Sequence, residues 1–203
     1  MNLEAEFGAI DIYLFDQILR GRITRSDRIF DAGCGSGRNL VYLLRSGCDV
    51  FGIDSDSDAI HDVRTLAAQL NPTLPPTNFR IESIERSTFP DQQATVVISS
   101  AVLHFAPDDE TFDAMLAGSW RALSAGGMFF CRLASSIGIE SRVRQIGPSA
   151  RRSRLPDGTD RYLVDEPFLM KRTESLGGKL LDPLKTTIVQ DQRAMTTWVV
   201  RKS

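Results

Sequence analysis

The nine residues DAGCGSGRN, at positions 31–39, combine a carboxylate with three alternating glycines. They follow the apolar end of a short predicted strand and precede a run with helical spacing. Gly33, Gly35 and Gly37 allow positive φ and let a ligand approach the backbone closely, and the free N–H groups of the following helix attract an anionic group. The pattern indicates a ligand-binding turn; a plain strand-to-helix turn without a ligand is the alternative.

A second acid, Asp54, ends the next predicted strand, DVFGID at 49–54. In a βαβ unit the carboxyl ends of both strands lie at one edge of the sheet, so Asp54 stands beside the glycine turn. Its carboxylate can accept hydrogen bonds from both hydroxyls of a ribose. A helix N-cap is the alternative role, for which DSDSD offers several candidates. We interpret Asp54 as a ribose-binding residue.

The glycine spacing separates two classes of nucleoside cofactor. A dinucleotide site needs GxGxxG, but here Arg38 occupies the sixth position and the acid Asp31 precedes the glycines. DxGxGxG resembles motif I of the class I S-adenosylmethionine-dependent methyltransferases. Within that family, GCGSGRNLVYLL followed by GCDVFGID is similar to the tellurite-resistance and thiopurine-like small-molecule branch. The resemblance implies methyl transfer from S-adenosylmethionine, and an NAD-dependent oxidoreductase is the less favoured alternative.

The same resemblance implies where the cofactor lies. The three glycines would follow its methionine part, Asp31 would receive the ammonium group and Asp54 the ribose. Ser83 and Ile84 stand where the family usually places an acid and an apolar residue for adenine, with Glu82 and Glu85 close by. Ser99 and Ser100 end the fourth strand, where small residues let the sulfonium face the acceptor; an ordinary strand end is the alternative. The predicted cofactor residues are Asp31, Gly33, Cys34, Gly35, Gly37, Arg38, Asn39, Asp54, Ser55, Ser83, Ile84, Ser99 and Ser100.

Methyl transfer is an in-line displacement, so the expected contribution of the protein is orientation, which can supply roughly 7–11 kcal/mol. His104, in VLHF after the fourth strand, is the candidate general base, and a packing role is the alternative. His61 is expected at the surface. The serine at position 83 and the scarcity of bases leave open a non-catalytic regulatory module that binds the cofactor.

Arginines are concentrated in one segment of the chain. Seven arginines and three acids lie between Arg132 and Arg161, so this segment carries +4 while the remainder carries −6. Because arginine binds carboxylate and phosphate bidentately, we expect a small anionic acceptor, against the alternative of a solvated mobile loop. The predicted acceptor residues are Tyr13, His104, Arg132, Arg151, Arg152, Arg161 and Tyr162.

Alternating strand and helix patterns predict an α/β fold that positions these residues. The methyltransferase resemblance implies a Rossmann-like, seven-stranded, mostly parallel sheet of order 3-2-1-4-5-7-6, with strand 7 antiparallel and helices on both faces. A single domain over 1–203 is expected, with one N-terminal cap helix in 1–21 and an arginine-rich insertion at 136–165 on the acceptor side. The tail, KLLDPLKTTIV and AMTTWVVRK joined by QDQR, predicts a β-hairpin.

Composition excludes several other classes. The chain has 203 residues, 42% apolar content and a net charge of −2, which argues against general nucleic-acid binding. Its three scattered cysteines suggest neither a disulfide framework nor a zinc site, and a cytoplasmic location fits best. No stretch is apolar and long enough to predict a membrane span. Monomer and dimer both remain open.

Overall fold

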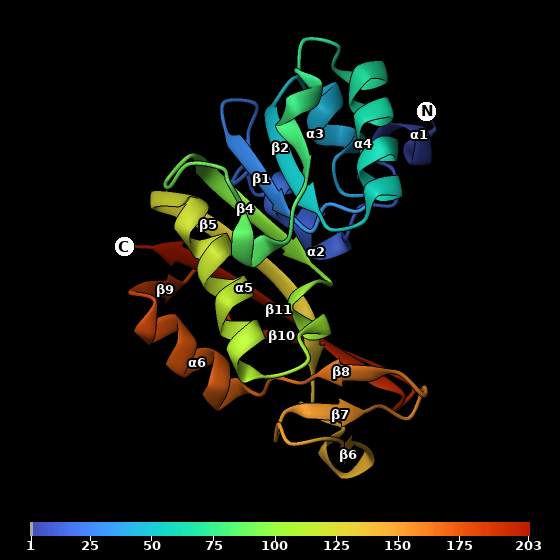
Figure 1. Cartoon of the computed structure of the whole chain (residues 1–203), viewed down its shortest axis with the longest axis vertical. Coiled ribbons are helices and arrows are strands. Elements are labelled where there is room, and N and C mark those ends of the chain that lie inside the picture. The colour runs from blue at the N-terminus through green and yellow to red at the C-terminus, as the bar shows by residue number, and fades with distance from the viewer. Residues whose placement is uncertain (1) are drawn as a thin grey trace.

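The computed structural model describes residues 2–203, and a twisted sheet runs through its centre (Figure 1). The strands are β1 Arg28–Ala32, β2 Asp49–Asp54, β3 Phe79–Ile81, β4 Ala94–Ser100, β5 Leu123–Ser135, β9 Gly178–Leu180, β10 Lys185–Val189 and β11 Arg193–Lys202. Their order is β10-β11-β5-β4-β1-β2-β3, and β9 also pairs with β11. Strands β1 to β5 pair in parallel, whereas β11 is antiparallel to β5. This order confirms the predicted Rossmann-like fold.

The sixth strand differs in one detail from the prediction. KLLDPLKTTIV forms two short strands, β9 and β10, which both pair antiparallel with β11. Pro183 lies between them and has no N–H to donate to a ladder, so pairing stops there and resumes at Lys185. The expected hairpin is formed by β10 and β11.

Helices cover both faces of the sheet. One face packs against α5 (Asp109–Ala122) and α6 (Glu166–Ser175), and the other against α2 (Ile12–Leu19), α3 (Val41–Arg45) and α4 (Ser57–Leu70). Side chains alternate between the faces, so Phe30 packs on the α5 side and Ile29 on the α4 side. Between residues 2 and 203, no helix is long and apolar enough to cross a membrane.

The N-terminal helix expected as one unit is two helices, α1 (Leu3–Phe7) and α2. Gly8 breaks the helix with φ of +63°, and a Cβ there would lie 2.7 Å from Val41 Cγ2, so the backbone packs directly on α3. Asp11 then caps α2 by accepting a hydrogen bond from the Tyr13 amide (2.9 Å). The apolar spacing of Leu3, Phe7, Ile10 and Leu14 runs through the break at Gly8, so the spacing alone could not reveal that the helix is divided.

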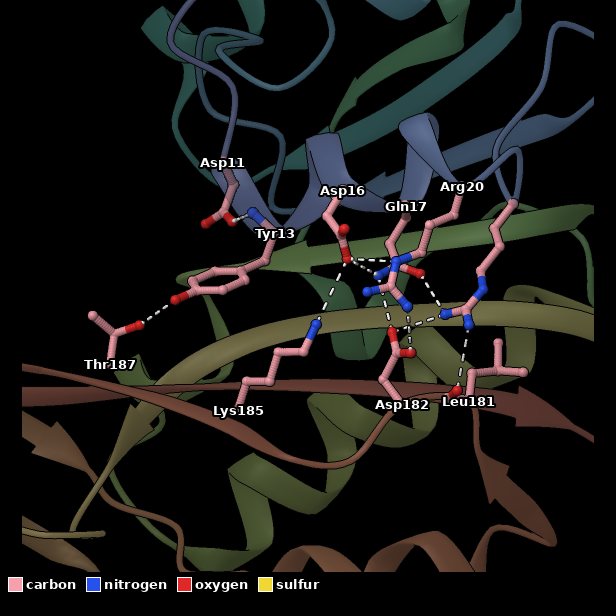
Figure 2. A network of polar contacts seen from close by, with 10 residues as sticks. Asp11, Tyr13, Asp16, Gln17, Arg20, Leu181, Asp182, Lys185 and Thr187 are labelled. Carbon is pink, nitrogen blue, oxygen red and sulfur yellow. Dashed lines mark hydrogen bonds and ion pairs between the residues drawn. The ribbon is translucent and has the colours of Figure 1, made fainter.

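A polar network joins α2 and the residues after it to the segment between β9 and β10 (Figure 2). The Asp182 carboxylate accepts hydrogen bonds from Gln17 (3.0 Å), Arg20 (3.1 Å) and Arg22 (2.8 Å). Burial raises the pKa of Asp182, but its hydrogen bonds and arginine charges outweigh that effect and lower it. The network holds the end of α2 against the sheet, while Tyr13, at its start, contacts Thr187 of β10 (2.6 Å).

The arginine-rich insertion contains a small antiparallel sheet of β6 (Arg144–Gln145), β7 (Arg152–Arg154) and β8 (Asp160–Tyr162). Figure 1 shows it at one end of the molecule, beyond β5 and β10. A satellite core of Ile139, Leu155 and Leu163 packs with Ala134 of β5 and Ala194 of β11. These apolar contacts hold the insertion in place, so its arginines are fixed relative to the main sheet.

Candidate functional site

A cavity of about 680 Å³ opens at the carboxyl ends of β1, β2 and β4. Its walls include ten of the predicted cofactor residues: Gly33, Cys34, Gly35, Arg38, Asn39, Asp54, Ser55, Ser83, Ile84 and Ser100. Ala101, which follows Ser99 and Ser100 at the predicted sulfonium position, also lines the cavity. Sequence reasoning missed other residues on the walls: Ser36, Val102, Phe105, Ala106, Pro107, Thr111 and Met115. Most of these follow β4 or begin α5, and only the parallel sheet, which brings distant strand ends to one edge, places them here.

The glycine loop is held tightly against the end of β2. The amides of Gly33 and Cys34 both donate to the Ile53 carbonyl (2.9 Å each), and the Gly35 amide donates to Asp54 Oδ2 (2.8 Å). A Cβ at Gly33 would lie 2.6 Å from Val102 Cγ2, so only glycine fits there. Contrary to the prediction, Gly37 does not line the cavity. A Cβ there would meet Leu66 of α4, so the missing side chain lets the loop pack against that helix.

Asp31 lies directly before this loop and is almost completely buried, with 1% of its surface exposed. Neither of its carboxylate oxygens has a hydrogen-bond partner among the described residues. Burial raises the pKa of Asp31 to about 8; Arg38 lowers it and Asp54 raises it. Asp31 is not among the residues that line the cavity. An enclosed carboxylate without partners favours a cation beside it, which agrees with the predicted contact to the ammonium group of S-adenosylmethionine.

The predicted adenine end of the cavity contains Ser83 and Ile84, which follow β3. The Glu82 carboxylate, which also lines this end, accepts hydrogen bonds from the Thr88 amide (2.8 Å) and hydroxyl (2.6 Å). Glu85 is exposed at the cavity wall. Both glutamates flank the predicted pair in sequence, so they are the acids available near an adenine ring.

Ser99 and Ser100, at the end of β4, face different surroundings. Ser100 lines the cavity, and its hydroxyl accepts a hydrogen bond from Arg38 (3.2 Å). Contrary to the prediction, Ser99 does not line the cavity and is fully buried, because successive side chains of a strand point to opposite faces. Ala101 then turns the chain with φ of +64°, and its amide donates to the Arg132 carbonyl (2.7 Å).

An ion pair between α2 and β5 borders this end of the cavity. The Asp11 carboxylate is fully buried, pairs with Arg132 (2.9 Å) and accepts a longer hydrogen bond from Ser100 (3.4 Å). The Arg132 guanidinium lies 5.4 Å from the centre of the Tyr13 ring. Tyr13 in turn contacts Thr187 of β10 through its hydroxyl (2.6 Å), as Figure 2 shows.

His104 lies in a 3-10 helix, Leu103–Phe105, and is 4% exposed. Its Nδ1 accepts a hydrogen bond from the Ala134 amide (3.0 Å). Burial, together with the positive charges of Arg161, Arg132 and Arg152, lowers the pKa of His104 to about 3. A neutral ring whose Nδ1 is already an acceptor carries its proton on Nε2. The prediction of a general base at this position is therefore wrong: neither ring nitrogen is free to accept a proton.

Two arginines of the insertion border the same region. Arg152 donates to the Ala106 carbonyl (3.2 Å), and the Arg161 guanidinium lies 4.8 Å from the centre of the Phe105 ring. Phe105 and Ala106 both line the cavity. Among residues 2–203, neither arginine has a carboxylate at ion-pair distance, because Arg154 holds Asp160 through two hydrogen bonds (2.7 and 3.0 Å).

Two predicted acceptor residues lie elsewhere. Arg151 pairs with Asp165 (3.0 Å) and lies 4.0 Å from the centre of the Phe168 ring, which directs it toward α6. Tyr162 is fully buried, stacks on Phe112 at 4.5 Å and donates to Asp109 (2.7 Å). The expectation that these two residues face the acceptor is wrong, because α5 and α6 offer them apolar and ionic partners in the core.

The cavity, the glycine loop and Asp54 at the end of β2 have the layout of a nucleoside-cofactor site of the Rossmann-like class. Residues 30–131 match the family described as methyltransferase domain. Trans-aconitate 2-methyltransferase of Rhizobium rhizogenes is 26% identical over 125 residues, which is 60% of this chain and 44% of that protein. The chain thus matches less than half the length of this curated relative.

Solved structures show the same fold. The Burkholderia thailandensis 1,6-didemethyltoxoflavin-N1-methyltransferase, with bound 1,6-didemethyltoxoflavin and S-adenosylhomocysteine, has a TM-score of 0.71 at 16% identity, over 100% of this chain and 81% of that one. TehB from Haemophilus influenzae has a TM-score of 0.69 at 18% identity, over 97% of this chain and 63% of that one. The family match and the shared fold confirm the predicted resemblance to class I methyltransferases, and TehB shares that fold.

The chain belongs to the methyltransferase domain family, since the family match covers half of it. S-adenosylmethionine is the cofactor of this family, as predicted. The family match contradicts the alternative of an NAD-dependent oxidoreductase.

Proposed function

We propose that this protein transfers a methyl group from S-adenosylmethionine to a small anionic acceptor. The observation that carries the proposal is the position of three arginines next to residues of the cavity wall: Arg152 donates to the Ala106 carbonyl (3.2 Å), the Arg161 guanidinium lies 4.8 Å from the centre of the Phe105 ring, and the Arg132 carbonyl accepts from the Ala101 amide (2.7 Å). Two of these arginines have no carboxylate partner among the described residues. Positive groups that are fixed and have no carboxylate at ion-pair distance favour an anion in the remaining space.

The residues of the cavity divide the work of holding the cofactor. Asp54 would bind the ribose, Asp31 the ammonium group, and Ser83 with Ile84 the adenine. When bound, S-adenosylmethionine supplies a methyl group on a positively charged sulfur. Ser100 and Ala101 leave room at the end of β4 where donor and acceptor would meet. The protein's own contribution is then alignment and exclusion of water, which can supply roughly 7–11 kcal/mol.

The curated relative supports an anionic acceptor, since its name gives trans-aconitate as the compound on which it acts. The solved toxoflavin methyltransferase supports a small-molecule acceptor more generally. The geometry adds a reason specific to this chain. The insertion is ordered by its own apolar core, so Arg152 and Arg161 have fixed positions beside the cavity.

Calorimetric titration with S-adenosylmethionine, followed by turnover with a panel of acceptors, tests the proposal. We expect binding that is weakened roughly tenfold to a hundredfold in Asp54→Ala, and formation of S-adenosylhomocysteine only with anionic compounds. The non-catalytic regulatory module, left open by the sequence, predicts binding without turnover for every acceptor. Absence of binding to the wild-type protein would refute both functions.

A further inference from the structure

We call the part of the cavity near Ser100 and Phe105 its acceptor end. Among residues 2–203, this end contains no side chain suited to accept a proton. His104 is excluded because its Nδ1 accepts from Ala134 and its neutral ring carries the other proton on Nε2. Asp11 has a fully buried carboxylate that already accepts from Arg132, Ser100 and the Tyr13 amide. Burial raises the pKa of the Cys34 thiol, so this thiol stays protonated and is not a base.

The carboxylates that do line the cavity lie at its other end. Asp54 ends β2, and Glu82 and Glu85 follow β3, next to the positions expected to hold ribose and adenine. An acceptor that attacks through a hydroxyl or an ammonium would have to lose a proton, and no group near Ser100 is placed to take it. A carboxylate needs no such help, since its pKa near 4 leaves it ionised at neutral pH.

Donors and positive charges lie near His104, whose ring is 4.6 Å from the Phe105 ring that Arg161 contacts at 4.8 Å. Arg132 approaches from β5, Arg152 from β7 and Arg161 from β8, and the Ala134 amide occupies Nδ1. Nε2 has no hydrogen-bond partner within residues 2–203 and is not completely enclosed. The imidazole N–H and the guanidinium groups therefore offer donors to one oxyanion, and the arginine fork matches the planar shape of a carboxylate.

We infer that the attacking atom of the acceptor is a carboxylate oxygen, bound by Arg152, Arg161 and the Nε2–H of His104, so that the product is a methyl ester. The inference rests on the proposed function and names its substrate class. The carboxylate oxygen supplies the electron pair of the new O–C bond, and the sulfur of the donor keeps the pair of the broken C–S bond. One negative and one positive charge disappear together and no proton is released. His104 is a specificity-determining residue and takes no proton.

Two variants of His104 separate its structural contact from its donor. His104→Asn retains an oxygen that can accept from the Ala134 amide but cannot reach as far as Nε2. His104→Gln places an amide N–H near the position of Nε2. Binding of succinate, with uncharged succinamide as the control, is measured by calorimetry on the protein saturated with S-adenosylhomocysteine. We expect His104→Asn to weaken succinate binding roughly tenfold or more, as for loss of a hydrogen bond to a charged group, and His104→Gln to restore most of it.

Kinetics and magnetic resonance complete the test. We expect kcat with small carboxylic acids to be constant between about pH 6 and 8, the product to be cleaved by alkali as esters are, and the ¹⁵N shifts of His104 to show a proton on Nε2. A kcat that rises with a pKa near 6 or 7 and loses this dependence in His104→Gln would overturn the inference. Turnover of thiols, phosphates or amines but not of carboxylates would overturn it while leaving methyl transfer intact. Failure to bind S-adenosylmethionine would instead refute the proposed function.

Discussion

Asp31 provides the most quantitative prediction, because its carboxylate is enclosed without a partner and has a pKa raised to about 8 by burial. Below that pH the unliganded protein holds Asp31 protonated, whereas an ammonium group beside it requires the ionised form. Binding of S-adenosylmethionine must therefore release a proton. We expect the Kd for S-adenosylmethionine to fall about tenfold for each unit that the pH rises between about 5.5 and 7, a range in which the ligand's own α-amino group remains protonated.

Calorimetry in buffers of different ionisation enthalpy measures this proton release directly. Asp31→Asn is the matched control, since it keeps the shape but cannot ionise. We expect it to bind more weakly, with a Kd independent of pH. A wild-type Kd that is equally independent of pH would refute the assignment of Asp31 to the ammonium group.

The same raised pKa has a consequence for stability. The folded protein binds the Asp31 proton more tightly than the unfolded chain, whose carboxyl has the ordinary pKa of 3.8. The stabilising contribution is thus complete below about pH 4 and is lost as pH rises toward 8, by at most about 1.4 kcal/mol per pH unit. Asp31→Asn removes this loss, so we expect it to exceed the wild type in the free energy of unfolding at about pH 8 to 9.

Three further predictions concern the site. Asp54→Ala should weaken S-adenosylmethionine binding roughly tenfold to a hundredfold in calorimetry, as for loss of hydrogen bonds to a charged group, and an unchanged Kd would remove Asp54 from the ribose site. Arg161→Ala should raise the KM for an anionic acceptor roughly tenfold while the exposed Arg142→Ala control leaves it unchanged; equal effects would mean that only overall charge matters. Gly33→Ala should cost roughly 1–3 kcal/mol more in denaturant unfolding than Gly158→Ala, because both have positive φ but only Gly33 has a neighbour within 4 Å; equal costs would contradict the tight packing of the loop.

Local sequence patterns were enough to predict the parts of the site that come from single strand-to-helix connections. Gly33, Gly35 and Asp54 lie within one βαβ unit, whose geometry follows from short-range rules on turns and parallel pairing. The order of the sheet was instead implied by the resemblance to class I methyltransferases, because local patterns do not specify which strands pair. The split of the N-terminal helix at Gly8 could not be predicted, because it depends on a close contact with Val41 on another helix.

Only the tertiary structure decided the acceptor side. In the sequence, Arg151 and Arg152 are equivalent neighbours, yet alternation along the insertion directs Arg151 to Asp165 and Arg152 to the cavity rim. The sequence offers His104 as a candidate base, with a packing role as the alternative. In the fold, the Ala134 amide, thirty residues away, donates to its Nδ1. The sequence determined that a methyl donor could bind, because that site is built locally. The chemistry of the acceptor depends on side chains that meet only when β5, the insertion and α2 pack together.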